Sequence, residues 1–341
     1  MRTGSTTGSQ FRDSVATYFS SLVEKRDFAG AVKYYEAHRA LIGDTGGAWA
    51  GEMLLQVSKA CVSLSDYPAA LKNARIAQAM ASQDGDNDLL AEVFSAIGGI
   101  LRDMGQKKEA QKAFQDAESI FRRNDNLEGQ SRVLNQLAGL LFQQADYRSA
   151  LDVLMDAVEI ARKLDDKKKL AFMMANIGRI YTFMGDLNVA EKHIVIGVDL
   201  SRELGDELEV ARGFLSLGYI HIQRAEYEKA EQALAEAYPR LIAARSSRDE
   251  AIYLSYLGEL RFRSGHHDEA HEALNRSLAI AEGIAPRTTL TGRILRLLAE
   301  LYLRMGNERQ ASKFASRAIV IMEDSSNKVE LGALMRIKAQ L

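Results

Sequence analysis

The stretch that decides the fold is residues 171–204, which read AFMMANIGRIYTFMGDLNVAEKHIVIGVDLSREL. Its first half places apolar or small residues at steps of three, three, one and three, the spacing of one face of an α-helix. Its second half repeats such a face after the turn at Gly185, where the Asp186 carboxylate can cap the next helix. Gly178 and Ala190 are small residues on the facing sides, so two antiparallel helices can approach closely. The stretch therefore predicts a helix–turn–helix hairpin, which needs neighbours because it is too small to bury its own apolar faces.

The same pattern recurs along the chain with a period of 40 residues. One alanine marks the start of each second helix, and the successive spacings of these alanines are 39, 40, 40, 40, 40, 40 and 41 residues. The marker alanines are Ala31, Ala70, Ala110, Ala150, Ala190, Ala230, Ala270 and Ala311. Twelve residues before them stand Phe19, Ser58, Gly98, Ala138, Gly178, Gly218, Gly258 and Ala299, of which only the first is large. A period of this length predicts a solenoid in which each unit packs on its neighbours.

The repeat resembles a known family. Gly or Ala, then Ala twelve residues on, then an apolar residue four further on is similar to the tetratricopeptide repeat, whose usual length is about 34 residues. The longer period is similar to that of Pins-type polarity adaptors, kinesin light chains and the sensor regions of some bacterial regulators. HEAT and armadillo repeats share the length but lack this Gly/Ala–Ala step. The resemblance implies an all-α fold: an α-solenoid of about eight tandem helix–turn–helix repeats in a right-handed superhelix, followed by a C-terminal helix.

Three segments are expected along the chain. Residues 1–10, MRTGSTTGSQ, are rich in Gly, Ser and Thr and are predicted to be a disordered tail. Residues 11–325 are predicted to hold the eight repeats. For residues 326–341 two interpretations stay open: a capping helix with one polar face, or the first helix of a truncated ninth repeat in a longer protein.

Composition narrows the classes of function. The chain has 44 Lys and Arg against 46 Asp and Glu, and this balance argues against a general nucleic-acid binder. No apolar run approaches the roughly 18 residues of a membrane-spanning helix, and the N-terminus lacks a signal-peptide pattern. A single cysteine excludes an internal disulfide framework. We therefore expect a cytoplasmic protein without a membrane partner.

Catalytic motifs are absent from the sequence. There is no GxSxG, P-loop or CxxC, and no GxGxxG after a strand, so we expect no enzyme activity, no catalytic residue and no cofactor. The histidines His266, His267 and His271 cluster in HHDEAH, and the last two are four residues apart, a spacing that can hold zinc. The motif is not HExxH, however, and no nearby Cys completes a tetrahedron. We therefore predict no metal site.

The resemblance implies that a ligand binds on a concave surface lined by the first helices of the repeats. When the small residue of each repeat is counted as position 8, the lining positions are 2, 5, 9, 12 and 13, with an Asn at position 6 that clamps a peptide backbone. Asn176 matches position 6, whereas Ser216 and Tyr256 depart from it, so a continuous Asn ladder is absent. The predicted partner-binding residues are Asn176, Arg179, Phe183, Arg212, Tyr219, Gln223, Tyr256, Phe262, Arg263, Arg293, Arg296 and Arg304.

The charges at these positions suggest the chemistry of the ligand. In repeats five to eight the lining positions carry six Arg against Glu259 and Glu300, whereas in repeats two to four the charges cancel. Arg holds carboxylates with two parallel hydrogen bonds, so we expect an acidic segment with apolar anchors that contact Phe183, Tyr219 and Phe262.

Two functions of different classes follow from this interpretation. The first is a non-enzymatic protein-interaction scaffold or adaptor that binds a peptide or protein segment. The alternative is the sensor or regulatory region of a signalling or transcription regulator that a peptide or small ligand controls. Self-assembly through the terminal repeats is a third hypothesis.

Overall fold

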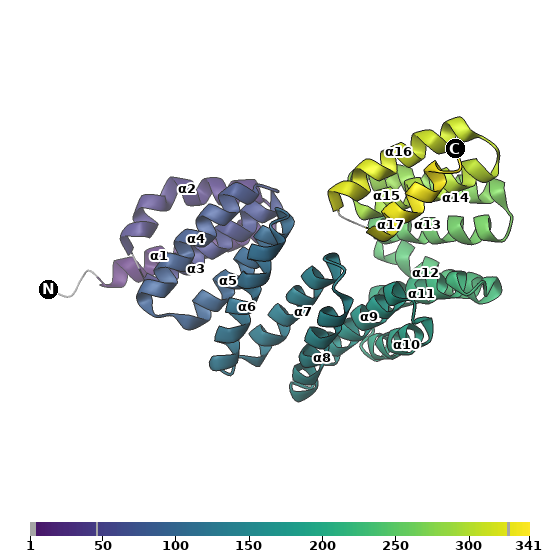
Figure 1. Ribbon diagram of the computed structural model, residues 1–341. Helices are drawn as coiled ribbons and strands as arrows, with labels where there is room; N and C mark the ends of the chain where they lie inside the picture. Colours follow the sequence, from purple (N-terminus) through teal and green to yellow (C-terminus); the bar gives the residue numbers. More distant parts are fainter. Residues whose placement is uncertain (1–4, 46, 326–327) are drawn as a thin grey trace. The chain divides into compact units, whose positions relative to one another are not determined.

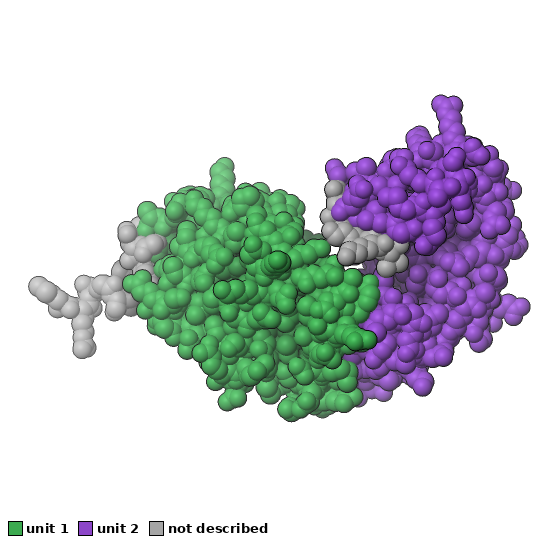
Figure 2. Space-filling model, viewed as in Figure 1, with its two compact units in different colours: residues 1–165 green, residues 166–341 purple. Residues whose placement is uncertain are grey.

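The computed structural model describes residues 5–45, 47–325 and 328–341, and over these ranges the chain forms 17 α-helices and no strand (Figure 1). The helices are α1 Ser5–Glu24, α2 Phe28–Thr45, α3 Gly47–Ser63, α4 Tyr67–Asp84, α5 Asn87–Asp103, α6 Lys107–Arg123, α7 Leu127–Gln143, α8 Tyr147–Lys163, α9 Lys167–Met184, α10 Leu187–Glu203, α11 Glu207–Gln223, α12 Tyr227–Ala244, α13 Ser247–Arg263, α14 His267–Ile284, α15 Thr289–Arg304, α16 Glu308–Ser325 and α17 Lys328–Lys338. They form two compact units, residues 1–165 and 166–341 (Figure 2). Within each unit successive helices pack in chain order, which is the architecture of an α-solenoid.

The contact between the two helices of a repeat depends on small residues. All eight marker alanines are 0% exposed. A Cβ atom on Gly178 would lie 2.4 Å from Cγ1 of Ile194, which is closer than real Cβ atoms come. In the second repeat Ser58 replaces glycine, and its hydroxyl donates a hydrogen bond of 2.8 Å to the carbonyl of Ala70. The predicted hairpin contact is thus confirmed.

The turn inside each repeat has one conformation throughout. The residue five before each marker alanine has a positive φ, between 50° and 90°, whichever residue occupies it. These residues are Arg26, Ser65, Gly105, Ala145, Gly185, Ala225, Gly265 and Gly306. The next residue precedes the second helix, and as predicted the Asp186 carboxylate accepts a hydrogen bond there, from the amide of Val189. Gln106, Glu226 and His266 occupy the same place without a capping bond from their side chains.

The two ends of the chain extend the helical array. α1 begins at Ser5, inside the segment 1–10 for which disorder was expected, and residues 1–4 of that segment lie outside the described residues. The helix is continuous with the amphipathic stretch that buries Val15 and Phe19, which accounts for its early start. At the other end α17 packs on α15 and α16.

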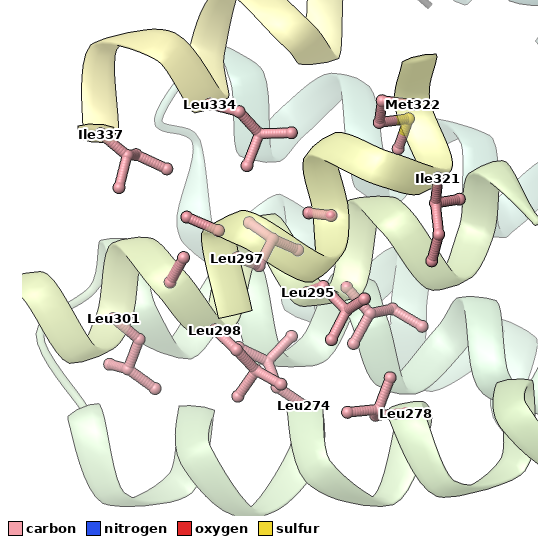
Figure 3. Close-up of a cluster of buried hydrophobic side chains, with 14 of the residues drawn as sticks. Leu274, Leu278, Leu295, Leu297, Leu298, Leu301, Ile321, Met322, Leu334 and Ile337 are labelled. Atoms are coloured by element: carbon pink, nitrogen blue, oxygen red, sulfur yellow. The ribbon is translucent and has the colours of Figure 1, made fainter. Parts of the chain in front are cut away.

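The last core of unit 2 shows how α17 is held. Leu334 and Ile337 of α17 are 0% and 4% exposed and join a cluster of buried residues from α13 to α16. In Figure 3 they lie above Leu298 and Leu301 of α15, so the apolar core continues from one helix layer to the next. Among the helices of the described ranges, none combines the length and apolar content that crossing a membrane requires.

Candidate ligand-binding face

Four first helices of unit 2, α9, α11, α13 and α15, follow one another in space as they do in sequence. On each of them positions 2, 6, 9 and 13 lie at steps of four, three and four, which places them on one side of the helix. We call this surface the first-helix face. It comprises Phe172, Asn176, Arg179 and Phe183 of α9, Arg212, Ser216, Tyr219 and Gln223 of α11, Ile252, Tyr256, Glu259 and Arg263 of α13, and Arg293, Leu297, Glu300 and Arg304 of α15.

A buried carboxylate lies in the middle of this face. Glu259 is 1% exposed, and its Oε1 accepts hydrogen bonds from Nε2 of Gln223 at 3.0 Å and from Nη2 of Arg263 at 2.8 Å. Its Oε2 accepts a bond of 2.7 Å from Nη2 of Arg293. Burial alone would raise the pKa of Glu259, but the charges of Arg293, Arg263 and Arg296 outweigh burial and lower its pKa to about 2. The carboxylate is therefore ionised and occupied by its own neighbours.

Two tyrosines, Tyr219 and Tyr256, also belong to this group. We call the group the Glu259 cluster, and it comprises Tyr219, Gln223, Tyr256, Glu259, Arg263 and Arg293. The rings of Tyr219 and Tyr256 stack with their centroids 5.1 Å apart, and the Arg293 guanidinium lies 4.5 and 4.7 Å from the two centroids. Both distances are within the range of cation–π attraction. Burial would lower the pKa of Arg293, but Glu259 raises it above its usual value. Five predicted residues, from α11, α13 and α15, are thus brought together around one acidic residue.

Two further arginines, Arg296 and Arg212, also form ion pairs within the chain, so the net positive charge predicted from sequence is too high. Nη1 of Arg296 donates to Oε1 of Glu300 at 2.6 Å, and its Nε donates to Glu330 of α17. Arg212 donates to Oδ2 of Asp249 at 2.9 Å and also to Glu209. The charge count from sequence omitted three of these carboxylates because they lie outside the lining positions.

The omitted carboxylates could have been predicted from their separation in sequence from the arginines. Glu209 stands three residues before Arg212 on the same helix, where oppositely charged side chains pair. Asp249 stands 37 residues after Arg212, and Glu330 stands 34 residues after Arg296. Both separations are close to one repeat, as expected for neighbouring first helices. The surplus of positive charge on α11, α13 and α15 is therefore largely cancelled.

Helix α9 presents a different surface. Residues 167–184 contain no Asp or Glu, and Phe172 and Phe183 are 46% and 47% exposed. Nη2 of Arg179 donates a hydrogen bond of 3.1 Å to Oδ1 of Asn176 on the preceding turn. The Arg179 side chain reaches solvent, but the protein around it removes part of its hydration and so lowers its pKa from the usual value. Tyr256 opposes this shift, and the charge of Arg248 on α13 adds to it.

Two predicted site residues lie away from these groups. The Phe262 ring packs against the α13–α17 core and lies 6.0 Å from the ring of His267 on α14. It faces its partner helix, so it does not join Phe183 and Tyr219 as an anchor. Arg304 is exposed near the C-terminal end of α15.

The three clustered histidines have separate neighbours. Nε2 of His271 lies 2.7 Å from the hydroxyl of Tyr302, and Nδ1 of His266 lies 3.1 Å from Oγ of Ser264. His267 contacts Phe262. Within the described ranges no group of three or more His, Cys, Asp or Glu side chains is placed to hold a metal ion.

Comparison with known families agrees with this architecture. A model of the tetratricopeptide repeat matches residues 129–195, 209–283 and 249–324, which is more than half of the chain. A second model of the same repeat matches residues 91–124. The chain belongs to the tetratricopeptide repeat family. A search of curated proteins gives no significant match.

Several solved structures share the fold. The apo form of RapI is 18% identical, with 80% of this chain and 97% of that chain covered and a TM-score of 0.68. The apo form of the quorum sensor NprR from B. thuringiensis is 15% identical, with 91% and 87% covered and a TM-score of 0.71. The Rap conjugation gene regulator of the plasmid pLS20, in complex with the Phr* peptide, is 16% identical, with 86% and 77% covered and a TM-score of 0.62. At these identities the likeness concerns the fold.

Proposed function

We propose that the protein is a non-enzymatic scaffold or adaptor that binds a peptide or protein segment on the first-helix face of unit 2. The observation that carries the proposal is the Glu259 cluster together with α9. Aromatic and arginine side chains, the types enriched at binding hot spots, are held next to one another by contacts across successive repeats. Such preorganisation lowers the entropy that a ligand must lose on binding.

The alternative function is a sensor region that a peptide or small ligand controls. The names of two structures with the same fold favour it, since one is a quorum sensor and the other a regulator in complex with a peptide. Both functions require a ligand on the first-helix face. They differ in whether binding changes the activity of an attached or associated effector.

We further propose that the ligand is an acidic segment with apolar anchors, and that the protein acts in the cytoplasm without nucleic acid, cofactor or metal. An arginine that is already paired within the chain gains less from an acidic ligand, so the internal ion pairs limit where such a ligand can bind tightly. Arg212 and Arg263 hold carboxylates of their own chain, so charge reversal at these two residues would damage the fold as well as any binding. Helix α9, which has no carboxylate, is the basic part of the face.

The test is to block the first-helix face without replacing any residue of the Glu259 cluster. Ser216 is a partly exposed residue of α11 between Arg212 and Tyr219, and Ser216→Trp places a large side chain there. Gln232→Trp, on the exposed side of α12 in the same repeat, is the matched control. Peptides selected from a random display library on the wild-type protein should lose binding to Ser216→Trp and keep it with Gln232→Trp.

Two outcomes would contradict this proposal. If both tryptophan variants bind the selected peptides as the wild type does, the first-helix face is not the site. If the folded wild-type protein selects no peptide at all, the peptide-binding function is wrong. Circular dichroism of each variant confirms that it remains helical.

A further inference from the structure

We propose that α9 recognises an extended acidic segment in which one carboxylate stands between two apolar side chains. The apolar side chains contact Phe172 and Phe183, and the carboxylate binds Arg179. This inference rests on the proposed function and adds to it the sequence pattern of the ligand.

The four residues concerned form a single stripe on α9. Phe172, Asn176, Arg179 and Phe183 follow at steps of four, three and four, so they lie within about 60° of one another around the helix axis. The two phenylalanines are nearly half exposed, although side chains of this size gain most when they are covered. An exposed aromatic at each end of the stripe, with a guanidinium between them, matches a ligand that alternates apolar and acidic groups.

The charge of α9 favours an acidic ligand over a basic or neutral one. Of the 17 helices in the described ranges, α9 is the one without an Asp or Glu residue, so no carboxylate of its own repels an incoming acid. Arg179 is partly desolvated and lies within electrostatic range of Arg248. A bound carboxylate would offset the lost hydration and the repulsion between these two arginines at once.

The spacing of the stripe sets the register of the ligand. A helix rises about 1.5 Å per residue, so Arg179 lies about 10 Å from Phe172 and about 6 Å from Phe183 along the axis. An extended chain advances about 3.3 Å per residue and turns every second side chain to the same face, so the nearest steps that keep all three side chains towards α9 are about four and two ligand residues. The expected pattern is apolar-x-x-x-acidic-x-apolar in one chain direction, and its reverse in the other.

The probes are two fluorescein-labelled peptides, GLTSTETLG and GLTETSTLG, which present this pattern in the two directions. Binding to the full-length protein is followed by fluorescence anisotropy, and the tighter peptide is used further. Replacing its glutamate by lysine should abolish binding. Replacing both leucines by serine, or moving them apart by two inserted residues, should weaken binding about tenfold or more.

Variants of the protein then locate the contacts. Phe172→Ser and Phe183→Ser should each weaken binding about tenfold, whereas Ile196→Ser, at a residue of α10 that is also 46% exposed, should leave it unchanged. Arg179→Glu should lose the glutamate peptide and gain the lysine peptide. A purely structural role of Arg179 would not produce such an exchange.

Failure of this inference is distinguishable from failure of the proposed function. If neither probe binds while library peptides do, or if probe binding resists the α9 variants but is lost in Ser216→Trp, the α9 pattern is wrong and peptide binding stands. If no probe and no library peptide binds the wild type, the proposed function fails, and the inference fails with it.

Discussion

The same repeat position has different surroundings on two helices of unit 2. Position 9 is Glu259 on α13 and Arg179 on α9. Glu259 is buried and joins side chains of three helices, whereas Arg179 remains at the surface beside two exposed phenylalanines. Position in the repeat therefore sets only the direction in which a side chain points. Whether the side chain is buried in an ion-pair cluster or stays at the surface depends on what the neighbouring repeats place opposite it.

The largest expected loss of stability follows from changing the buried residue, Glu259. Glu259→Gln leaves Arg293 and Arg263 without their shared counter-charge, and breaking a buried ion pair in this way costs about 3–5 kcal/mol. Urea unfolding followed by circular dichroism at pH 7 measures the loss. A variant as stable as the wild type would show that the cluster contributes nothing to the fold.

Lowering the pH should remove the stabilisation that ionised Glu259 gives to the wild-type fold. The folded-state pKa of Glu259 is about 2, below its ordinary value of 4.5, so its ionisation stabilises the fold above about pH 4.5. This contribution, about 3 kcal/mol, is lost as the pH falls from 4.5 towards 2. The Glu259 carboxyl gains its proton as the pH approaches 2, whereas the glutamine of the variant is neutral throughout, so the difference in stability between the wild type and Glu259→Gln should narrow between pH 5 and pH 2. A constant gap would contradict the lowered pKa.

A smaller loss of stability is expected when the contact between the two helices of a repeat is overpacked. Gly178→Leu and Gly218→Leu overpack the same position in repeats five and six, which costs about 1–3 kcal/mol or more. A Cβ on Gly178 would meet the Ala190 carbonyl oxygen at 3.0 Å as well as Ile194, whereas a Cβ on Gly218 would meet only the flexible end of Leu234 as closely. Gly178→Leu should therefore lower the melting temperature more. The reverse order would mean that the Gly218 contact is the tighter one.

The smallest expected change in stability follows from replacing Arg179, which lies at the surface. Arg179→Gln should change the free energy of unfolding by less than about 0.5 kcal/mol, because the side chain reaches solvent. The same urea experiment measures it, with Glu259→Gln as the contrasting variant at the equivalent position. A loss of several kcal/mol would show that Arg179 is structural and that the comparison does not hold.

The fold could be predicted because close contacts restrict residue type. Ala190 is fully buried and a Cβ on Gly178 has no room, so small residues recur every 40 positions and the period is visible in the sequence. Similarly, the Asp186 cap was predictable from a local rule.

The site could be predicted only in part. Tyr219, Tyr256 and Arg293 were identified by position, but their partnership with Glu259 depends on how neighbouring helices are staggered, and one sequence does not state that stagger. Phe262 was placed on the face but packs towards His267, because position 12 lies at the border between two sides of a helix. Charges were misjudged where a partner came from outside the lining positions, as Glu330 does for Arg296.

The turn inside each repeat has an evolutionary consequence. Its left-handed residue is Arg26 in one repeat, Ala145 in another and Gly185 in a third, with the backbone conformation unchanged. Because the junction is defined by backbone shape and not by a particular side chain, a gene segment encoding 40 residues can be duplicated or deleted at this point without creating a new kind of turn. Each such event would add or remove one whole first helix, and with it one stripe of the first-helix face. The size and composition of that face can therefore diverge by changes in repeat number as well as by point mutation.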